Sequence, residues 1–285
     1  MEVARLAKAE IVSMDAFQIY RGMDIGTAKA KKKDQEEIPH HLLDLVEPEE
    51  PFSSANYKRE GEKTLTDLRI RKKKAIWVGG TGLYHRVMAE GLSAAPPTER
   101  ETANEIETMS TPEMADEIRR VDPIWAQGAD LQNRRRMVRA LAVWRQSGRT
   151  LSDWQRNETK AGPLSGTETY VLFPKLEELA PSILGRVTQM LEEGWVEEVR
   201  GLMKKKGWQG SPGSRAIGYS EVALLIEGKM GLKEACEKIV TATRAYAKRQ
   251  LTWFRGLSKF QPIEIDPQLP PSRKAVETLV TALTP

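Results

Sequence analysis

The sequence predicts an α/β protein with a parallel sheet as its core and a helical segment inserted into that core. Apolar runs at 10–13 and 76–78 predict strands, and each is followed by a polar turn that contains Asp15 or the glycines of 79–82. Such turns at the carboxyl ends of parallel strands form the binding sites of open α/β sheets. Mostly helical patterns follow until an apolar run at 170–173, which is typical of an inserted helical segment. Together these features indicate an enzyme acting on a phosphate-containing substrate.

The composition is that of an ordinary globular protein. The chain has 285 residues, 40% of them hydrophobic and 29% charged, with a net charge of +4. Cys236 is the only cysteine, which excludes an internal disulfide and a cysteine zinc site and favours a reducing cytoplasm. No apolar run reaches the roughly 18 residues of a membrane helix. We expect a cytoplasmic monomer with no membrane contact.

The first 97 residues alternate between short apolar runs and helical patterns. The first strand delivers Asp15 to its end, Ser53 or Ser54 caps the long helix, and Gly91 closes the last one. The expected elements are a helix within 1–8, a strand at 10–13, a strand at 40–46, a helix at 55–71, a strand at 75–78 and a helix at 83–90.

A break at Pro96-Pro97 introduces a helical insertion. Its expected elements are helices at 99–108, at 111–121 with Thr111 as cap, and at 131–146 before Gly148, with a further turn at 150–157. We assign residues 1–97 and 166–285 to the α/β catalytic core and residues 98–165 to the insertion. The second part of the core is expected to hold strands at 170–173 and 263–265 and helices from 181 onward, at 221–228, 233–255 and 272–283.

Asp15 is the first candidate for chemistry. A carboxylate at the end of a strand, in a partly desolvated cleft, can act as a general base or orient a metal-bound water. The alternative is a structural acid that caps a turn or a helix start, and position alone favours this second interpretation.

The glycine turn at 79–82 is the second candidate. Glycine lets backbone amides approach an anion closely, the turn feeds a helix N-terminus that favours negative charge, and Thr81 adds a hydroxyl donor. The alternative is a tight strand-to-helix turn that binds nothing.

Basic side chains gather in two of the expected helices. Arg135, Arg136 and Arg139 share one helix face, opposite an apolar side, which suits contact with a nucleic-acid backbone. Arg244 and Lys248 lie four residues apart on the late helix, where arginine can grip a diphosphate. A solvated charged face, or cations that complement a helix dipole, are the alternatives.

The adjacent pair His40-His41 has no third ligand at metal spacing, and we interpret it as structural.

Six segments resemble the tRNA dimethylallyltransferase family, also called tRNA isopentenyltransferases. They are DAFQIYRGMDIGTAK (15–29), IPHHLLDLVEP (38–48), VGGTGLY (78–84), RALAVW (139–144), SRAIGYSE (214–221) and TRAYAKRQLTWFR (243–255), in the family's order and over nearly the whole chain. The resemblance implies a P-loop-kinase-like core with a helical insertion that grips the anticodon stem. It also implies transfer of a dimethylallyl group from dimethylallyl diphosphate to N6 of adenosine 37 in tRNA, with the base flipped into a channel.

The resemblance assigns roles to residues as well. It makes Asp15 the general base on the N6 amine, and Thr81 and Arg244 donors that help the diphosphate to leave. The diphosphate-binding set is Gly79, Gly80, Thr81, Gly82, Arg244 and Lys248. The tRNA-binding set is Asp15, Ala16, Phe17, Gln18, Arg135, Arg136, Met137, Val138 and Arg139. Mg²⁺ bound with the diphosphate is expected by analogy, since the sequence shows no dedicated metal cage.

The sequence departs from the family mainly at its start. Family members begin with a strand and a P-loop, G-x-x-x-x-G-K-[ST], before the helix that here ends at about Lys8. We expect either a native protein that extends about 20 residues further upstream or a degenerate form, and as written the chain should bind dimethylallyl diphosphate poorly and aggregate. Ala16 replaces the usual serine and Asn133-Arg134 an Asp-Pro pair, while the lack of a C-terminal zinc finger indicates the bacterial type.

Two other functions remain open at this point. A tRNA-binding remnant that has lost catalysis together with the P-loop would keep the arginine helix but leave tRNA unmodified. A small-molecule nucleotide kinase would share the core, but the helical insertion with its arginine face argues against it. Nucleoside analysis of tRNA incubated with dimethylallyl diphosphate separates the enzyme from the remnant.

Overall fold

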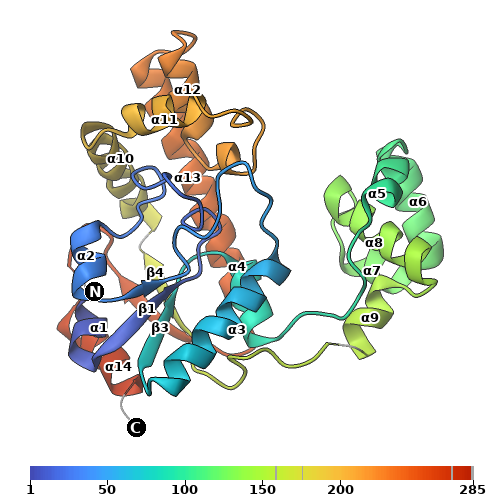
Figure 1. Cartoon of the computed structure of the whole chain (residues 1–285), viewed down its shortest axis with the longest axis horizontal. Coiled ribbons are helices and arrows are strands. Elements are labelled where there is room, and N and C mark those ends of the chain that lie inside the picture. Colours follow the sequence, from blue (N-terminus) through green and yellow to red (C-terminus); the bar gives the residue numbers. More distant parts are fainter. Residues whose placement is uncertain (158, 175, 271, 284–285) are drawn as a thin grey trace. The chain divides into compact units, whose positions relative to one another are not determined.

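The structure is a computed structural model that describes residues 1–157, 159–174, 176–270 and 272–283 (Figure 1). Its contacts divide the chain into two compact units, one formed by Met1–His85 with Gly166–Pro285 and the other by Arg86–Ser165. The first unit holds two parallel sheets with many helices, and the second is helical. The expected α/β class is therefore confirmed.

Three parallel strands form the first sheet, in the order β2–β1–β3. The central strand β1 (Ala9–Ser13) is buried along its whole length and pairs with β2 (His40–His41) on one side and β3 (Lys74–Val78) on the other. The strand expected at 40–46 is thus only two residues long. It stops because Leu42 and Asp44 have left-handed backbone angles, which an extended strand does not admit.

A second parallel sheet in the same unit consists of β4 (Tyr170–Pro174) and β5 (Gln261–Ile265). The sequence predicts one sheet, but β3 and β4 are not hydrogen-bonded to each other. Within the described part of the chain, each of these two strands has a single neighbouring strand.

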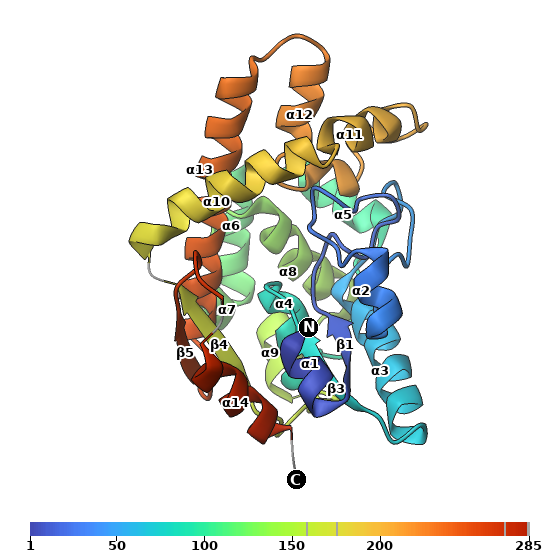
Figure 2. The same cartoon turned by 90° about the vertical axis from the view of Figure 1, so that its left-hand side faces the viewer.

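Helices complete the first unit: α1 (Glu2–Ala7), α2 (Lys32–Glu37), α3 (Ser54–Ile70), α10 (Leu176–Glu192), α11 (Trp195–Met203), α12 (Tyr219–Ile226), α13 (Leu232–Arg255), α14 (Arg273–Ala282) and a 3₁₀ turn at Gly213–Arg215. α4 (Gly82–Ala89) begins in the first unit and ends in the second. α3 begins at a capping box of Ser53 and Asn56, as the sequence predicts for Ser53. α10 to α13 lie beyond the carboxyl ends of β1 and β3 (Figures 1 and 2). No described helix is both long and apolar enough to span a membrane.

The main core of this unit lies between that helical group and the loop after β1. Trp195, Tyr219 and Ile19 are at most 1% exposed within it. Full burial of a large apolar side chain contributes about 1.5–3 kcal/mol relative to leaving it exposed. This packing fixes the position of the loop that carries Asp15.

The second unit packs around one central helix. Its elements are α5 (Arg100–Glu107), α6 (Thr111–Val121), α7 (Pro123–Gly128), α8 (Arg134–Ser147) and α9 (Leu151–Asn157). Met137 and Leu141 of α8 are fully buried in a core shared with α5 and α6. The apolar stripe of α8 is therefore what holds the unit together.

Helix ends in this unit differ in detail from the expected ones. α6 is capped by the Ser110 side chain and not by Thr111. Asn133 caps α8, so that helix starts at 134 instead of 131. Gly148 ends α8 with φ of 68°, the left-handed conformation that glycine adopts without strain. α7 is an additional helix, capped by Asp122.

Candidate active site

Asp15 lies in the turn directly after β1. The Met14 amide still donates to the Val78 carbonyl oxygen (2.7 Å), so sheet pairing holds the backbone up to this point. Asp15 Oδ1 accepts hydrogen bonds from the amides of Phe17 (2.8 Å) and Gln18 (3.1 Å). Asp15 therefore does cap its own turn, but through one oxygen. No residue in the described part of the chain donates to Oδ2, so this oxygen can accept a proton.

Burial makes Asp15 a better base than an exposed carboxylate. Desolvation raises the pKa of its carboxyl above the ordinary value, while the two amide hydrogen bonds and the charges of Arg186 and Lys29 oppose the rise. A raised pKa strengthens the carboxylate as a proton acceptor near neutral pH.

Arg186 is a charged neighbour of Asp15 that sequence reasoning missed. It lies on α10, its side chain is exposed, and its positive charge acts on the Asp15 carboxylate. No described residue forms an ion pair with it. The sequence carries no signal for this role, because Arg186 sits in an ordinary amphipathic helix and only tertiary packing brings that helix toward β1.

The glycine turn after β3 is pressed between the Asp15 turn and α13. A Cβ atom at Gly79 would lie 2.2 Å from the Met14 carbonyl oxygen, and one at Gly82 would lie 2.4 Å from Cδ2 of Trp253. Larger residues would push these segments apart. The glycines thus permit the close approach that joins the two strand ends to α13.

Thr81 is hydrogen-bonded to Met14 and Ala16, the residues on either side of Asp15. Its amide donates to the Met14 carbonyl oxygen (3.2 Å), and its Oγ1 accepts from the Ala16 amide (3.0 Å). The amide is therefore engaged within the protein, and the Thr81 side chain also hydrogen-bonds the Tyr246 side chain. Asp15 and Thr81, 66 residues apart in number, belong to one site.

α13 contacts the glycine turn through one face. Gln250 Nε2 donates to the Gly80 carbonyl oxygen (2.9 Å), and the Tyr246 hydroxyl donates to the same atom (3.4 Å). Arg244 and Lys248 are offset from these residues by two positions, and two residues turn an α-helix by about 200°. Both side chains are exposed, and no hydrogen bond or ion pair among the described residues joins either of them to Asp15 or Thr81. Their place in the diphosphate site stays a prediction.

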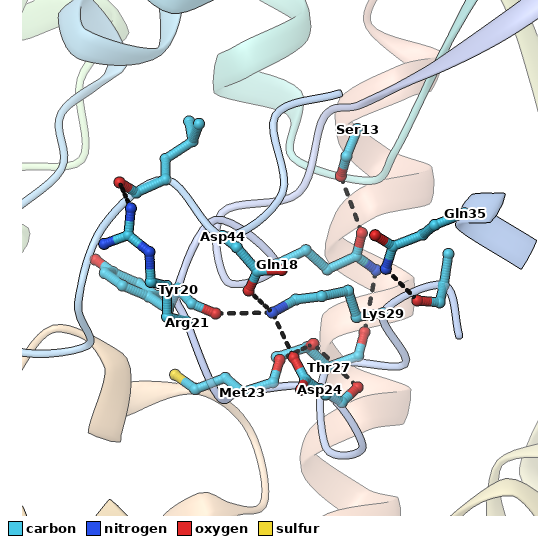
Figure 3. Close-up of polar contacts among 12 residues, drawn as sticks. Ser13, Gln18, Tyr20, Arg21, Met23, Asp24, Thr27, Lys29, Gln35 and Asp44 are labelled. Carbon is cyan, nitrogen blue, oxygen red and sulfur yellow. Dashed lines mark hydrogen bonds and ion pairs between the residues drawn. The ribbon is translucent and has the colours of Figure 1, made fainter. Parts of the chain in front are cut away.

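The loop after Asp15 is cross-linked by its own polar groups (Figure 3). The Gln18 side chain accepts a hydrogen bond from Ser13 Oγ (2.9 Å) and donates one to the Thr27 carbonyl oxygen (3.2 Å). Phe17 packs, half-buried, against the main core. Gln18 and Phe17 thus support the loop itself, although both were candidates for tRNA contact.

The five predicted tRNA-binding residues of the helical unit divide into two kinds. Arg135 and Arg136 are exposed, and no described residue forms an ion pair with either. Met137 and Val138 are buried in the core. Arg139 is half-buried and donates to the Pro96 carbonyl oxygen and to Thr98 Oγ1 (3.1 Å), and burial lowers its pKa.

The histidine pair contacts neighbouring protein groups: His40 Nδ1 lies 2.7 Å from the Ile38 carbonyl oxygen, and His41 contacts Glu10. His41 Nε2 lies 2.6 Å from Glu10 Oε2, and Arg71 binds both oxygens of the buried Glu10 carboxylate. The hydrogen bonds from Arg71 and His41 lower the pKa of Glu10 to about 2. No group of three or more candidate metal ligands occurs among the described residues.

The site defines a group-transfer enzyme: a half-buried carboxylate with one available oxygen lies beside the Thr81 hydroxyl at the carboxyl edge of a parallel sheet, within the electrostatic influence of Arg186. The profile of the IPP transferase family matches residues 18–257. The chain belongs to this family.

Relatives and solved structures agree with this placement. The chain is 37% identical to the tRNA dimethylallyltransferase of Syntrophobacter fumaroxidans, over 90% of this chain and 76% of that protein. It is 39% identical to the enzyme of the same name from Geobacter sulfurreducens, over 88% and 83%. The full-length tRNA isopentenylpyrophosphate transferase of Bacillus halodurans superposes with a TM-score of 0.70 at 29% identity, over 99% and 90%. A eukaryotic dimethylallyltransferase acting on tRNA gives 0.78 at 25% identity, over 92% and 69%.

Proposed function

We propose that this protein transfers the dimethylallyl group of dimethylallyl diphosphate to N6 of adenosine 37 in tRNA, giving N6-(dimethylallyl)adenosine and diphosphate. The observation that carries the proposal is the hydrogen bond from the Ala16 amide to Thr81 Oγ1, which connects the turn of Asp15 to the glycine turn. The chain also matches a tRNA dimethylallyltransferase over 90% of its length. The cytoplasm, where tRNA is processed, is the expected place of action.

Asp15 acts as the general base in this reaction. The N6 amine of adenine is a weak nucleophile, so removal of its proton as the carbon–nitrogen bond forms contributes directly to the rate. The available Oδ2 and the raised pKa of Asp15 support this role, because the carboxylate is held in place through Oδ1 alone.

The leaving diphosphate needs donors and positive charge as its carbon–oxygen bond breaks. The Thr81 hydroxyl supplies a donor, and Arg186 supplies a charge beside Asp15. The resemblance assigns diphosphate binding to Arg244, Lys248 and the glycines of the turn. We retain that set as a prediction.

Mg²⁺ is proposed to enter as part of the diphosphate substrate. Mg²⁺ in proteins commonly takes one or two carboxylates together with substrate phosphates, in place of a cage made of protein ligands alone. A bound ion would supply charge to the leaving group.

tRNA is held at both units in this proposal. The exposed Arg135 and Arg136 would contact backbone phosphates, while Met137, Val138 and Arg139 build the helix that presents them. The turn from Asp15 to Gln18 would face the target base. Extruding that base costs least where it is already unpaired, as in an anticodon loop.

Nucleoside analysis tests the proposal. tRNA incubated with the protein, dimethylallyl diphosphate and Mg²⁺ should yield N6-(dimethylallyl)adenosine by mass spectrometry. An Asp15→Asn variant should form it about 10²–10⁴-fold more slowly while binding tRNA within a few-fold of wild type. tRNA binding without product from the wild-type chain would favour a non-catalytic tRNA-binding protein.

A further inference from the structure

The most deeply buried charge near the site is Lys29. Its side chain is 1% exposed, and its ammonium group contacts the Tyr20 carbonyl oxygen (2.8 Å), Asp24 Oδ1 (2.6 Å) and Asp44 Oδ1 (2.6 Å) (Figure 3). A buried charge is costly unless it is paired and hydrogen-bonded, and here all three ammonium donors have partners. Replacing Lys29 by an apolar residue would leave these acceptors without their charged partner and destabilise the loop. The proposed chemistry of Asp15 and Thr81 does not use Lys29 directly.

The three acceptors come from separate points of the chain. Tyr20 and Asp24 belong to the loop after Asp15, and Asp44 follows β2. Lys29 therefore closes the loop on itself and ties it to the neighbouring segment. The Glu198 carboxylate of α11 adds a second tie, because it accepts from the amide of Asp24 (2.7 Å) and from the two amides that follow.

We propose that Lys29 is a positioning residue for the transfer reaction: by closing this loop it holds the Phe17 and Gln18 amides against Asp15 Oδ1 and so keeps Oδ2 directed at the nucleophile. The inference rests on the proposed function. It explains why a lysine is buried next to the catalytic turn, where an apolar side chain would fill the volume without a desolvation cost.

Lys29 also contributes charge at Asp15. Its ammonium group favours the ionised carboxylate, as does Arg186 of α10. Tyr57 of α3, Tyr84 of α4 and Tyr246 of α13 are the titratable side chains that interact with the same carboxylate. Removing the Lys29 charge would leave Asp24 and Asp44 uncompensated and raise the pKa of Asp15 further. Because the base must be deprotonated, the acid limb of the rate profile would then move to higher pH.

The test compares Lys29→Met with Lys31→Met as the matched control. Lys31 is two positions away, its side chain is 67% exposed, and its ammonium group pairs with Glu193 (2.8 Å), its single ion-pair partner among the described residues. For Lys29→Met we expect kcat to fall by roughly tenfold to a hundredfold, as a small misplacement of a reacting group does. The KM for dimethylallyl diphosphate should stay within about twofold, and the acid limb should shift upward in pH. Lys31→Met should match wild type in kcat, in KM and in the position of the acid limb.

A folded Lys29→Met protein with wild-type kcat and an unshifted pH profile would overturn the inference. If Lys29→Met does not fold, Asp44→Ala decides, since it removes one acceptor and leaves Lys29 with Tyr20 and Asp24. Its kcat should fall several-fold with KM unchanged, and wild-type kcat in folded Asp44→Ala would likewise overturn the inference. Absence of prenylated nucleoside with the wild-type chain would instead refute the proposed function, so the two failures are distinguishable.

Discussion

The loop after β1 and the helical unit hold their shapes by different means. The loop depends on polar contacts that span long sequence separations, such as Glu198 with the amide of Asp24 and Lys29 with Asp44. The helical unit depends on an apolar stripe, with Leu141 fully buried and Arg135 and Arg136 exposed. A catalytic carboxylate needs the first kind of support, because directional hydrogen bonds fix an oxygen atom more narrowly than apolar packing does.

The largest loss of kcat is expected from a substitution that removes a hydrogen bond to the loop after β1. Thr81→Val keeps the shape of the side chain but removes both the acceptor for the Ala16 amide and the donor to the diphosphate. Loss of such a donor typically lowers kcat by about 10²–10³-fold. Thr81→Ser, which keeps the hydroxyl, should retain most of the activity. Steady-state kinetics on both variants checks this, and equal losses would show that the methyl group matters as much as the hydroxyl.

Two arginine variants test which positive charge assists the reaction. Arg186→Ala should lower kcat by roughly several-fold, because the proposal has its charge assist the leaving diphosphate and solvent screens the charge of an exposed side chain. Arg244→Ala should cost less, since the hydrogen bonds of α13 to the glycine turn come from Tyr246 and Gln250 instead. The measurement is kcat at saturating dimethylallyl diphosphate. A larger loss for Arg244→Ala would reverse the assignment and restore the role that the resemblance implies.

Substitutions in the apolar core of the helical unit should lower the free energy of unfolding. Leu141→Ala opens a cavity in the core of the helical unit and should destabilise the protein by about 2–5 kcal/mol. Denaturant or thermal unfolding measures this. Arg119→Ala, which removes an exposed ion pair with Asp116, is the control and should leave stability unchanged. Equal stability of the two variants would mean that α8 is not the centre of its unit.

The smallest effect is expected from the surface arginines. Replacing Arg135 and Arg136 together by alanine should weaken tRNA binding and reduce the slope of log K against log salt by about 1.4–1.8, which corresponds to two phosphate contacts. The unfolding temperature should not change, because neither side chain is buried. An unchanged salt slope would remove both residues from the tRNA-binding surface.

Local patterns account for much of what the sequence predicted correctly. The Ser53 cap, the Gly148 helix end and the strands that deliver Asp15 and Thr81 all follow from a few neighbouring residues. Parallel pairing of β1 with β3 then places those two residues together, which a sheet-edge argument can foresee.

Other features depend on tertiary contacts that no local pattern carries. The strand at 40–46 was overestimated because left-handed angles at Leu42 and Asp44 interrupt it, although Asp44 gains Lys29 as its partner. Arg186 and Glu198 reach the site only because α10 and α11 pack against it. Neither is distinguishable in sequence from a surface residue of an amphipathic helix.

The pH dependence of single-turnover prenyl transfer tests the central claim most directly. If Asp15 accepts the N6 proton, the wild-type rate should fall as the pH drops through a pKa above the ordinary aspartate value of about 3.9. Asp15→Asn should lower the rate by about 10²–10⁴-fold and abolish that limb. An Asp15→Asn protein that keeps the wild-type rate, or keeps the same acid limb, would contradict the account.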